Sequence, residues 1–339
     1  MAVRDIAHVE LYTHDSQSSV NYFTAAMGFT KAAEYADHDR SCVLLRQGEV
    51  RLVVTSGPAT SRFLEQHGDG IADIALTCDD VAATRTAALA AGALPAIAMP
   101  GQVAVSGFGG VRHTLLPHPG TDGEPPVDRA WTTVANLSST VDARIGGLDH
   151  LAICLEGGSL GERADFYGSA FGLARYSSEY VDTGGQGMDS IVVRSESGKV
   201  TFTLVAPDVK KSPGQLDAFL DRNSGAGVQH LAFSVDEIIE ATREFRAKGV
   251  EFLSTPGTYY DMLQERFPGL SDEIADLRAE HVLADRDEWG YLLQLFSRSP
   301  YERNTLFFEL IQRRGSRGFG SANIRALYEA VERDRLAVE

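Results

Sequence analysis

Residues 147–154, with the sequence GLDHLAIC, correspond to residues 6–11 (IAHVEL) near the start of the chain. Both are short apolar runs around one histidine, a pattern typical of a buried β-strand. A second pair of apolar runs, residues 68–75 (GDGIADIA) and 225–232 (GAGVQHLA), corresponds in the same way. Because both motifs recur in the same order, we predict that the chain is an internal duplication.

The segments after these motifs also correspond. A helical pattern follows the first motif and ends near residues 28–29 or 171–172, and another follows the second motif and ends near 91–92 or 248–249. Each half therefore runs strand, helix and several strands, twice over, which predicts an α+β fold. Residues 117–146 are rich in Pro, Gly, Asp and Thr and form the expected linker. The predicted domains are residues 1–140, a scaffold without metal, and residues 141–339, the catalytic domain.

Composition limits the class of partner. The chain has 339 residues, 43% of them hydrophobic, which is enough for two domain cores. The net charge of −16 without a basic cluster argues against nucleic acid and anionic membranes. We find no pattern of a signal peptide or a membrane span. Cys42, Cys78 and Cys154 are odd in number and far apart, as expected for reduced thiols in a cytoplasmic protein.

Three polar residues lie inside apolar runs of the second half, namely His150, His230 and Glu309. A buried imidazole or carboxylate is costly unless something pairs with it, and a metal ion bound by all three removes that cost. Two imidazoles and one carboxylate on one face leave open positions on Fe(II), as non-heme oxygenases require. The alternative to metal binding is a structural role, in which each histidine is a hydrogen-bonded core residue and the glutamate is turned to solvent.

The first half departs from this pattern. His8 corresponds to His150, but Asp73 stands at the position of His230, and the sequence offers no counterpart for Glu309. We therefore expect one metal site, in the second half, and leave a degenerate first site as the alternative.

The second half resembles the 4-hydroxyphenylpyruvate dioxygenase family of the vicinal oxygen chelate superfamily, in residues 225–233, 249–253, 258–260, 290–296, 305–313 and 318–332. The resemblance covers nearly the whole chain. It implies paired βαβββ modules that form two open, barrel-like curved sheets with a C-terminal closing helix. It also implies Fe(II) on His150, His230 and Glu309, with 4-hydroxyphenylpyruvate and O2 as substrates.

This family contains two activities on one substrate. The dioxygenase hydroxylates the ring and forms homogentisate, whereas the 4-hydroxymandelate synthase branch hydroxylates the benzylic carbon. Three departures from the dioxygenase pattern resemble the synthase branch: Asn-Ile at 323–324 instead of Asn-Phe, Thr-Leu-Val-Ala at 203–206 instead of Pro-x-Asn-Glu, and Leu-Tyr at 327–328 instead of Leu-Phe. We therefore expect 4-hydroxymandelate as the product, for hydroxyphenylglycine in antibiotic biosynthesis.

The resemblance also implies the substrate-binding residues, which are Ser190, Thr203, Gln294, Phe319, Ile324 and Tyr328. Ser190, Thr203 and Gln294 would form the polar wall, and Phe319 would stack on the substrate ring. Residues 324, 327, 328 and 331 share one apolar helix face, which would bring Ile324 near the ring and Tyr328 near the phenol. Local strand hydrogen bonds and ordinary helix packing are the alternatives. The glycine-rich residues 315–320 before this helix are expected to be flexible.

Other classes of function remain as alternatives. One is the homogentisate-forming dioxygenase. A glyoxalase-type isomerase or an extradiol dioxygenase shares the scaffold, but the Gly-Phe-Gly segment at 318–320 argues against both. A non-catalytic small-molecule-binding protein would need no metal, so iron content would distinguish it. The sequence leaves open whether the chain forms a homodimer.

Overall fold

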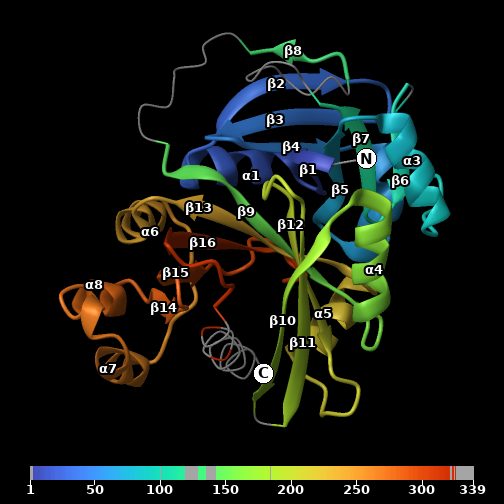
Figure 1. Cartoon of the computed structure of the whole chain (residues 1–339). Coiled ribbons are helices and arrows are strands. Elements are labelled where there is room, and N and C mark those ends of the chain that lie inside the picture. Colours follow the sequence, from blue (N-terminus) through green and yellow to red (C-terminus); the bar gives the residue numbers. More distant parts are fainter. Residues whose placement is uncertain are drawn as a thin grey trace.

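The computed structural model describes residues 3–99, 101–118, 129–134, 143–183 and 185–320, together with residues 323 and 325. Within them the chain forms two eight-stranded sheets, one from each half (Figure 1). The predicted boundary between residues 140 and 141 falls outside this part of the chain, so the division into domains stays a prediction.

The first sheet has the strand order β6-β7-β5-β1-β4-β3-β2-β8. Its strands are β1 (Val3–Tyr12), β2 (Thr30–Ala36), β3 (Ser41–Gln47), β4 (Val50–Ser56), β5 (Gly70–Cys78), β6 (Val103–Ser106), β7 (Arg112–Pro117) and β8 (Thr132–Thr133). The helices of this half are α1 (Ser16–Asn21), the π-helical turn η1 (Tyr22–Ala26), η2 (Pro58–Thr60), α2 (Ser61–His67) and α3 (Val81–Ala90).

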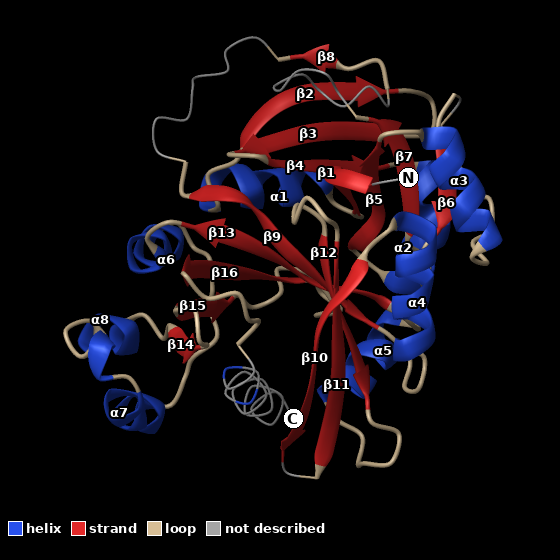
Figure 2. Ribbon diagram, in the orientation of Figure 1, coloured by secondary structure: helices blue, strands red, loops and turns tan. Residues whose placement is uncertain are grey.

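The second sheet has the order β10-β11-β12-β9-β13-β16-β15-β14. Its strands are β9 (Ile145–Cys154), β10 (Ala174–Thr183), β11 (Gln186–Arg194), β12 (Thr201–Pro207), β13 (Gly227–Val235), β14 (Leu283–Arg286), β15 (Tyr291–Phe296) and β16 (Phe307–Arg314). The helices are α4 (Leu160–Phe171), α5 (Gln215–Asn223), α6 (Ile238–Ala247), α7 (Gly257–Arg266), η3 (Pro268–Leu270) and α8 (Ile274–Ala279). In Figure 2, β10 and β11 lie on one side of this curved sheet, and β14 and β15 lie on the other.

The duplication is confirmed strand for strand. β1 lies between β4, to which it is parallel, and β5, to which it is antiparallel, and β9 has the same relation to β12 and β13. The register agrees as well, because His8 faces Ala75 and His150 faces Ala232. The vicinal oxygen chelate fold is thus present in both halves. The additions are β8 at one edge of the first sheet and β14 at the opposite edge of the second.

The predicted helix ends near residues 91–92 and 171–172 are confirmed, since α3 ends at Ala90 and α4 ends at Phe171. α3 begins after Asp80, whose carboxylate accepts a hydrogen bond from the Ala83 amide at 2.9 Å. α4 ends at Phe171 because Gly172 adopts the left-handed conformation, with φ of 73°.

A shared hydrophobic core joins the two halves. Phe23 and Phe29 of the first half pack against Phe308 and Phe233 of the second, with ring centres 5.3 and 6.0 Å apart. His113 of β7 lies 3.0 Å from the Tyr167 hydroxyl of α4. Polar contacts add to these buried rings, for example between His67 Nδ1 and the Asn223 carbonyl at 2.6 Å.

Two sequence expectations can be checked in the described residues. The three cysteines are buried free thiols, as predicted. In this part of the chain, no helix is long and apolar enough to span a membrane.

Candidate metal centre

Three adjacent strands bring the predicted ligands together: His150 on β9, His230 on β13 and Glu309 on β16. Ala232 pairs with both His150 and Glu309, so these two ligands flank its small side chain. His230 precedes Ala232 by two residues and therefore points to the same face of the sheet. The strand register alone thus collects three residues that are far apart in the sequence.

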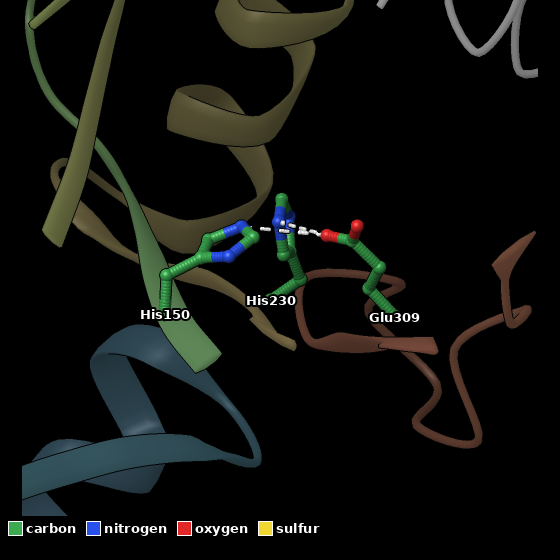
Figure 3. A group of neighbouring side chains, drawn as sticks. All are labelled: His150, His230 and Glu309. Carbon is green, nitrogen blue, oxygen red and sulfur yellow. Dashed lines mark ion pairs between the residues drawn. The ribbon is translucent and has the colours of Figure 1, made fainter. Parts of the chain in front are cut away.

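The three side chains converge on one point (Figure 3). The Nε2 atoms of His150 and His230 lie 3.4 and 3.2 Å from Glu309 Oε2. One ligand atom from each residue lies within 4.8 Å of the others, in the only such group among the described residues. The side chains are 4%, 8% and 1% exposed, respectively. This arrangement is a compact, buried, one-sided donor set.

The electrostatics of this group favour a cation. Burial would lower the pKa of His150, but the carboxylates of Glu309 and Asp149 raise it above its ordinary value. Burial would likewise raise the pKa of Glu309, but the two histidines lower it. His230 keeps a lowered pKa because burial disfavours its charged form. The centre thus holds an ionised carboxylate and attracts positive charge, which a divalent metal ion supplies better than a single proton.

The residues fit a metal on a second ground. The Nε2 atom of His230 is buried, and it has no hydrogen bond of acceptable geometry within the described structure. A buried polar atom without a partner costs about 1–3 kcal/mol. Coordination would remove this cost, and a 2-His-1-carboxylate set is the donor set of non-heme Fe(II) sites.

Each ligand is also held from behind. His150 Nδ1 lies 2.9 Å from Asp149 Oδ1, and His230 Nδ1 lies 3.3 Å from Gln229 Oε1. In the tautomer that carries its proton on Nδ1, each histidine would donate to this oxygen and leave Nε2 free to bind a metal. Glu309 Oε1 accepts a hydrogen bond from Gln294 Nε2 at 2.7 Å.

The sequence prediction missed the supporting roles of Asp149 and Gln229. A signal for both was present, since each is a polar residue directly before a ligand histidine in an apolar run.

A cavity lies beside the triad and contains four of the predicted substrate residues in its wall: Ser190, Thr203, Gln294 and Phe319. The other wall residues are Ala152, Ser177, Glu179, Met188, Val192, Val205, Gln229 and Phe296. Ile324 and Tyr328 lie outside the described residues, so their predicted positions stay predictions.

The four wall residues differ in how their polar groups are satisfied. Ser190 Oγ donates to the Glu179 carbonyl at 3.1 Å, which is the local strand bond considered as the alternative. The Thr203 hydroxyl is buried and has no partner in the described structure. Gln294 donates to Glu309 and accepts from Asn323, so its amide holds a metal ligand. Phe319 packs edge-on against His150, with ring centres 5.3 Å apart.

Residues 315–320 are held in place, in contrast to the expected flexible segment. The carboxylate of Asp287 accepts hydrogen bonds from Ser316 Oγ and from the amides of Arg317 and Gly318, at 2.7 to 2.8 Å. Glycine composition alone suggested mobility, but these long-range bonds were not visible in the local sequence.

The first half carries salt bridges where the second half carries the candidate metal ligands. Arg112 pairs with Asp73 on β5 as Phe307 pairs with His230 on β13. Thr114, two residues after Arg112, therefore takes the place of Glu309, which supplies the counterpart that the sequence did not reveal.

The Arg112 guanidinium forms an ion pair with Asp73, the residue at the position of His230. It lies 2.7 Å from Asp73 and 3.4 Å from Glu10, a residue that Arg129 also contacts at 3.1 Å. Cations of the protein itself thus neutralise these two carboxylates, and no metal-ligand group is found in the first half among the described residues.

Comparison with known proteins first defines the class. Residues 147–295 match the family model described as the glyoxalase/bleomycin resistance protein/dioxygenase superfamily. Residues 1–115 match the model described as hydroxyphenylpyruvate dioxygenase, N-terminal.

The relatives then define the family. The 4-hydroxyphenylpyruvate dioxygenase of Aspergillus fumigatus is 30% identical over 97% of this chain and 92% of its own length. That of Yarrowia lipolytica is 29% identical, over 98% and 92%. The chain belongs to the 4-hydroxyphenylpyruvate dioxygenase family. Among solved structures, a mutant of 4-hydroxymandelate synthase from Streptomyces coelicolor is 48% identical, with a TM-score of 0.90 over 99% of this chain and 100% of that chain.

Proposed function

We propose that this chain is an Fe(II)-dependent 4-hydroxymandelate synthase. In this reaction 4-hydroxyphenylpyruvate and O2 give 4-hydroxymandelate and CO2. The carboxylate of the substrate leaves as CO2, and both oxygen atoms of O2 enter 4-hydroxymandelate, one in its new carboxylate and one as the benzylic hydroxyl. The observation that carries the proposal is the 48% identity to a 4-hydroxymandelate synthase over essentially all of both chains. The 2-His-1-carboxylate geometry of His150, His230 and Glu309 supports it.

The proposed iron ligands are His150, His230 and Glu309. When bound, Fe(II) would supply O2 activation and a binding position for the 2-oxo acid of the substrate. The chain itself contributes orientation and exclusion of water, because the wall of the cavity is largely apolar. Asp149, Gln229 and Gln294 hold the three ligands in place from behind.

The wall residues have distinct proposed roles. The unpartnered hydroxyl of Thr203 would hydrogen-bond a polar group of the substrate, and Ser190, on the neighbouring strand, would form the same polar wall. Phe319 would pack on the substrate ring. By family resemblance, Ile324 would replace a planar phenylalanine beside the ring and bring the benzylic carbon to the iron, and Tyr328 would meet the phenol.

The direct test is product identification. The purified full chain is loaded anaerobically with Fe(II) and supplied with 4-hydroxyphenylpyruvate and O2, without 2-oxoglutarate. We expect O2 uptake, CO2 release and 4-hydroxymandelate on chromatography with mass detection. Homogentisate as the main product would overturn the proposal. His150→Ala, His230→Ala and Glu309→Ala are expected to abolish iron binding, and full activity in one of them would remove that residue from the ligand set.

The second candidate function is that of a homogentisate-forming 4-hydroxyphenylpyruvate dioxygenase, which is the activity named for several curated relatives. Ile324→Phe should shift the product mixture toward ring hydroxylation if Ile324 decides between the two. An unchanged ratio would remove Ile324 as the cause. A non-catalytic binding protein would contain no stoichiometric iron. The cytoplasmic location and the antibiotic pathway rest on sequence and resemblance alone.

A further inference from the structure

The closing segment, defined here as Gly315–Gly320 with Asn323, lies against the metal centre. It contributes Phe319 to the cavity wall, next to His150. It also approaches Gln294 so closely that a Cβ atom on Gly320 would lie 2.1 Å from Gln294 Oε1. Gly320 has a φ of +71°, so both its conformation and this contact require glycine. The segment is thus shaped to fit the ligand-bearing strands.

A first polar relay connects this segment to His150. The Arg313 guanidinium donates to both Asp149 oxygens, at 2.7 and 2.8 Å, and Asp149 in turn contacts His150 Nδ1. The remaining nitrogen of the guanidinium donates to the Gly318 carbonyl at 2.7 Å. Its Cζ atom also lies 5.1 Å from the ring centre of Phe319. One charged group therefore orients a metal ligand and the aromatic wall together.

A second relay connects the segment to Glu309. Asn323 Nδ2 donates to Gln294 Oε1 at 2.9 Å, and Gln294 Nε2 donates to Glu309 Oε1 at 2.7 Å. The Tyr259 hydroxyl lies 3.0 Å from Asn323 Oδ1 and fixes the asparagine from the other side. Asn323, Gln294 and Glu309 are 1%, 3% and 1% exposed, so water competes little for these bonds.

A third anchor holds the segment but takes no part in the relays. Asp287 binds Ser316, Arg317 and Gly318, and its other oxygen accepts from the amides of Trp289 and Gly290. None of these contacts includes a ligand residue. Asp287 therefore allows the segment to be loosened without touching the metal centre.

We propose that the seating of the closing segment and the binding of metal are thermodynamically coupled, with Arg313 and Asn323 as positioning residues that act through Asp149 and Gln294. The proposal rests on the proposed metal site. Coupling of this kind is reciprocal: a change that unseats the segment weakens metal binding by the same factor by which metal stabilises the seated segment. The aromatic wall is then complete only when the ligands are in place.

The first test measures the affinity of the full chain for Co²⁺ by its visible absorption. Removal of an outer partner of a metal ligand typically costs about 10–100-fold in affinity. We expect Arg313→Met to fall in this range, and Arg313→Lys to recover part of the loss. Asp287→Asn is the decisive variant, because it changes no residue of the metal centre. It should weaken the binding of Co²⁺ by about 10-fold, the lower end of this range. Arg314→Met is the matched control, since Arg314 pairs with Glu273 instead and should leave the affinity unchanged.

The second test observes the segment itself. Trp289 is 51% exposed, and the Arg317 guanidinium lies 5.1 Å from its ring centre. In a Trp131→Phe background, Trp289 is the only tryptophan left in the chain. We expect Zn²⁺, which does not quench fluorescence, to shift Trp289 emission and to slow tryptic cleavage after the exposed Arg317. Both effects should disappear in His230→Ala.

The outcomes separate the two proposals. A parent chain that binds no Co²⁺ removes the proposed metal site. A second combination of results is that the parent binds Co²⁺, the Asp287→Asn variant binds it with equal affinity, and Zn²⁺ does not change the Trp289 emission. This combination would contradict the coupling alone and leave the metal site in place. If Asp287→Asn does not fold, as judged by circular dichroism, Ser316→Ala deletes a single bond of this anchor and should give a smaller loss of the same sign. Unchanged affinity in that variant would also contradict the coupling.

Discussion

Removal of the Thr203 hydroxyl is predicted to stabilise the chain and to weaken substrate binding. This hydroxyl is buried in the cavity wall and has no partner in the described structure, and Thr203 is only 9% exposed. An unsatisfied buried hydroxyl costs about 1–3 kcal/mol. Thr203→Val replaces this hydroxyl with a methyl group of similar shape. It should therefore raise the free energy of unfolding of the metal-free chain by about 1 kcal/mol, which corresponds to about 1–2 °C in melting temperature for a chain of 339 residues.

The same change should weaken substrate binding. A hydrogen bond between the hydroxyl and the substrate is worth about 0.5–1.5 kcal/mol, and about 1.4 kcal/mol corresponds to tenfold in affinity. We therefore expect KM for 4-hydroxyphenylpyruvate to rise by about 3- to 10-fold. Urea unfolding of the metal-free chain and initial rates of O2 uptake measure the two effects.

Thr242 provides the matched control. Its hydroxyl is also buried without a partner in the described residues, but Thr242 lies on α6 and takes no part in the cavity wall. Thr242→Val should stabilise the chain by a similar amount and leave KM unchanged. A Thr203→Val variant that is less stable than the parent and has an unaltered KM would refute the reasoning, because the hydroxyl would then serve the fold rather than the ligand.

Three further predictions concern the first half and its contact with the second. Arg112→Met should lower the free energy of unfolding by about 3–5 kcal/mol, since it leaves the buried Asp73 carboxylate without its cation. Urea unfolding measures this loss. A parallel fall in iron content would contradict the prediction that the first half is a scaffold without metal. Burial raises the pKa of Glu10, but Arg129 and Arg112 outweigh it and lower that pKa below its ordinary value of 4.5. The stability that the ionised Glu10 contributes through Arg129 and Arg112 is therefore present above pH 4.5 and is lost as the pH falls further. Acid titration followed by circular dichroism will check this. Phe308→Ala should lower the free energy of unfolding by about 3–5 kcal/mol, because this ring packs against residues of both halves. Two separate calorimetric transitions in the parent would contradict this role of the shared core, because the halves would then unfold independently.

Local patterns were sufficient to predict the duplication and the three side chains that converge in the candidate metal centre. The alternation of a strand and the glycine at the end of a helix depend only on neighbouring residues, so both can be read from the sequence. The two pairs of matching runs became β1 with β9 and β5 with β13, which occupy equivalent positions in the two sheets. His150, His230 and Glu309 were recognisable because each is a metal-binding residue type inside an apolar run. A buried ionisable group is costly wherever the run is placed, so the signal did not require knowledge of the partner.

The partners of the ligands depended on the tertiary structure. Arg313 and Asp149 are 164 residues apart, and only the order β9-β13-β16 within the sheet brings them together as an ion pair. The same holds for Gln294 with Asn323, and for Arg112, whose guanidinium forms an ion pair with Asp73, the residue at the position of His230. Residue type can reveal that a side chain needs a partner, but the register of distant strands decides which group meets that need.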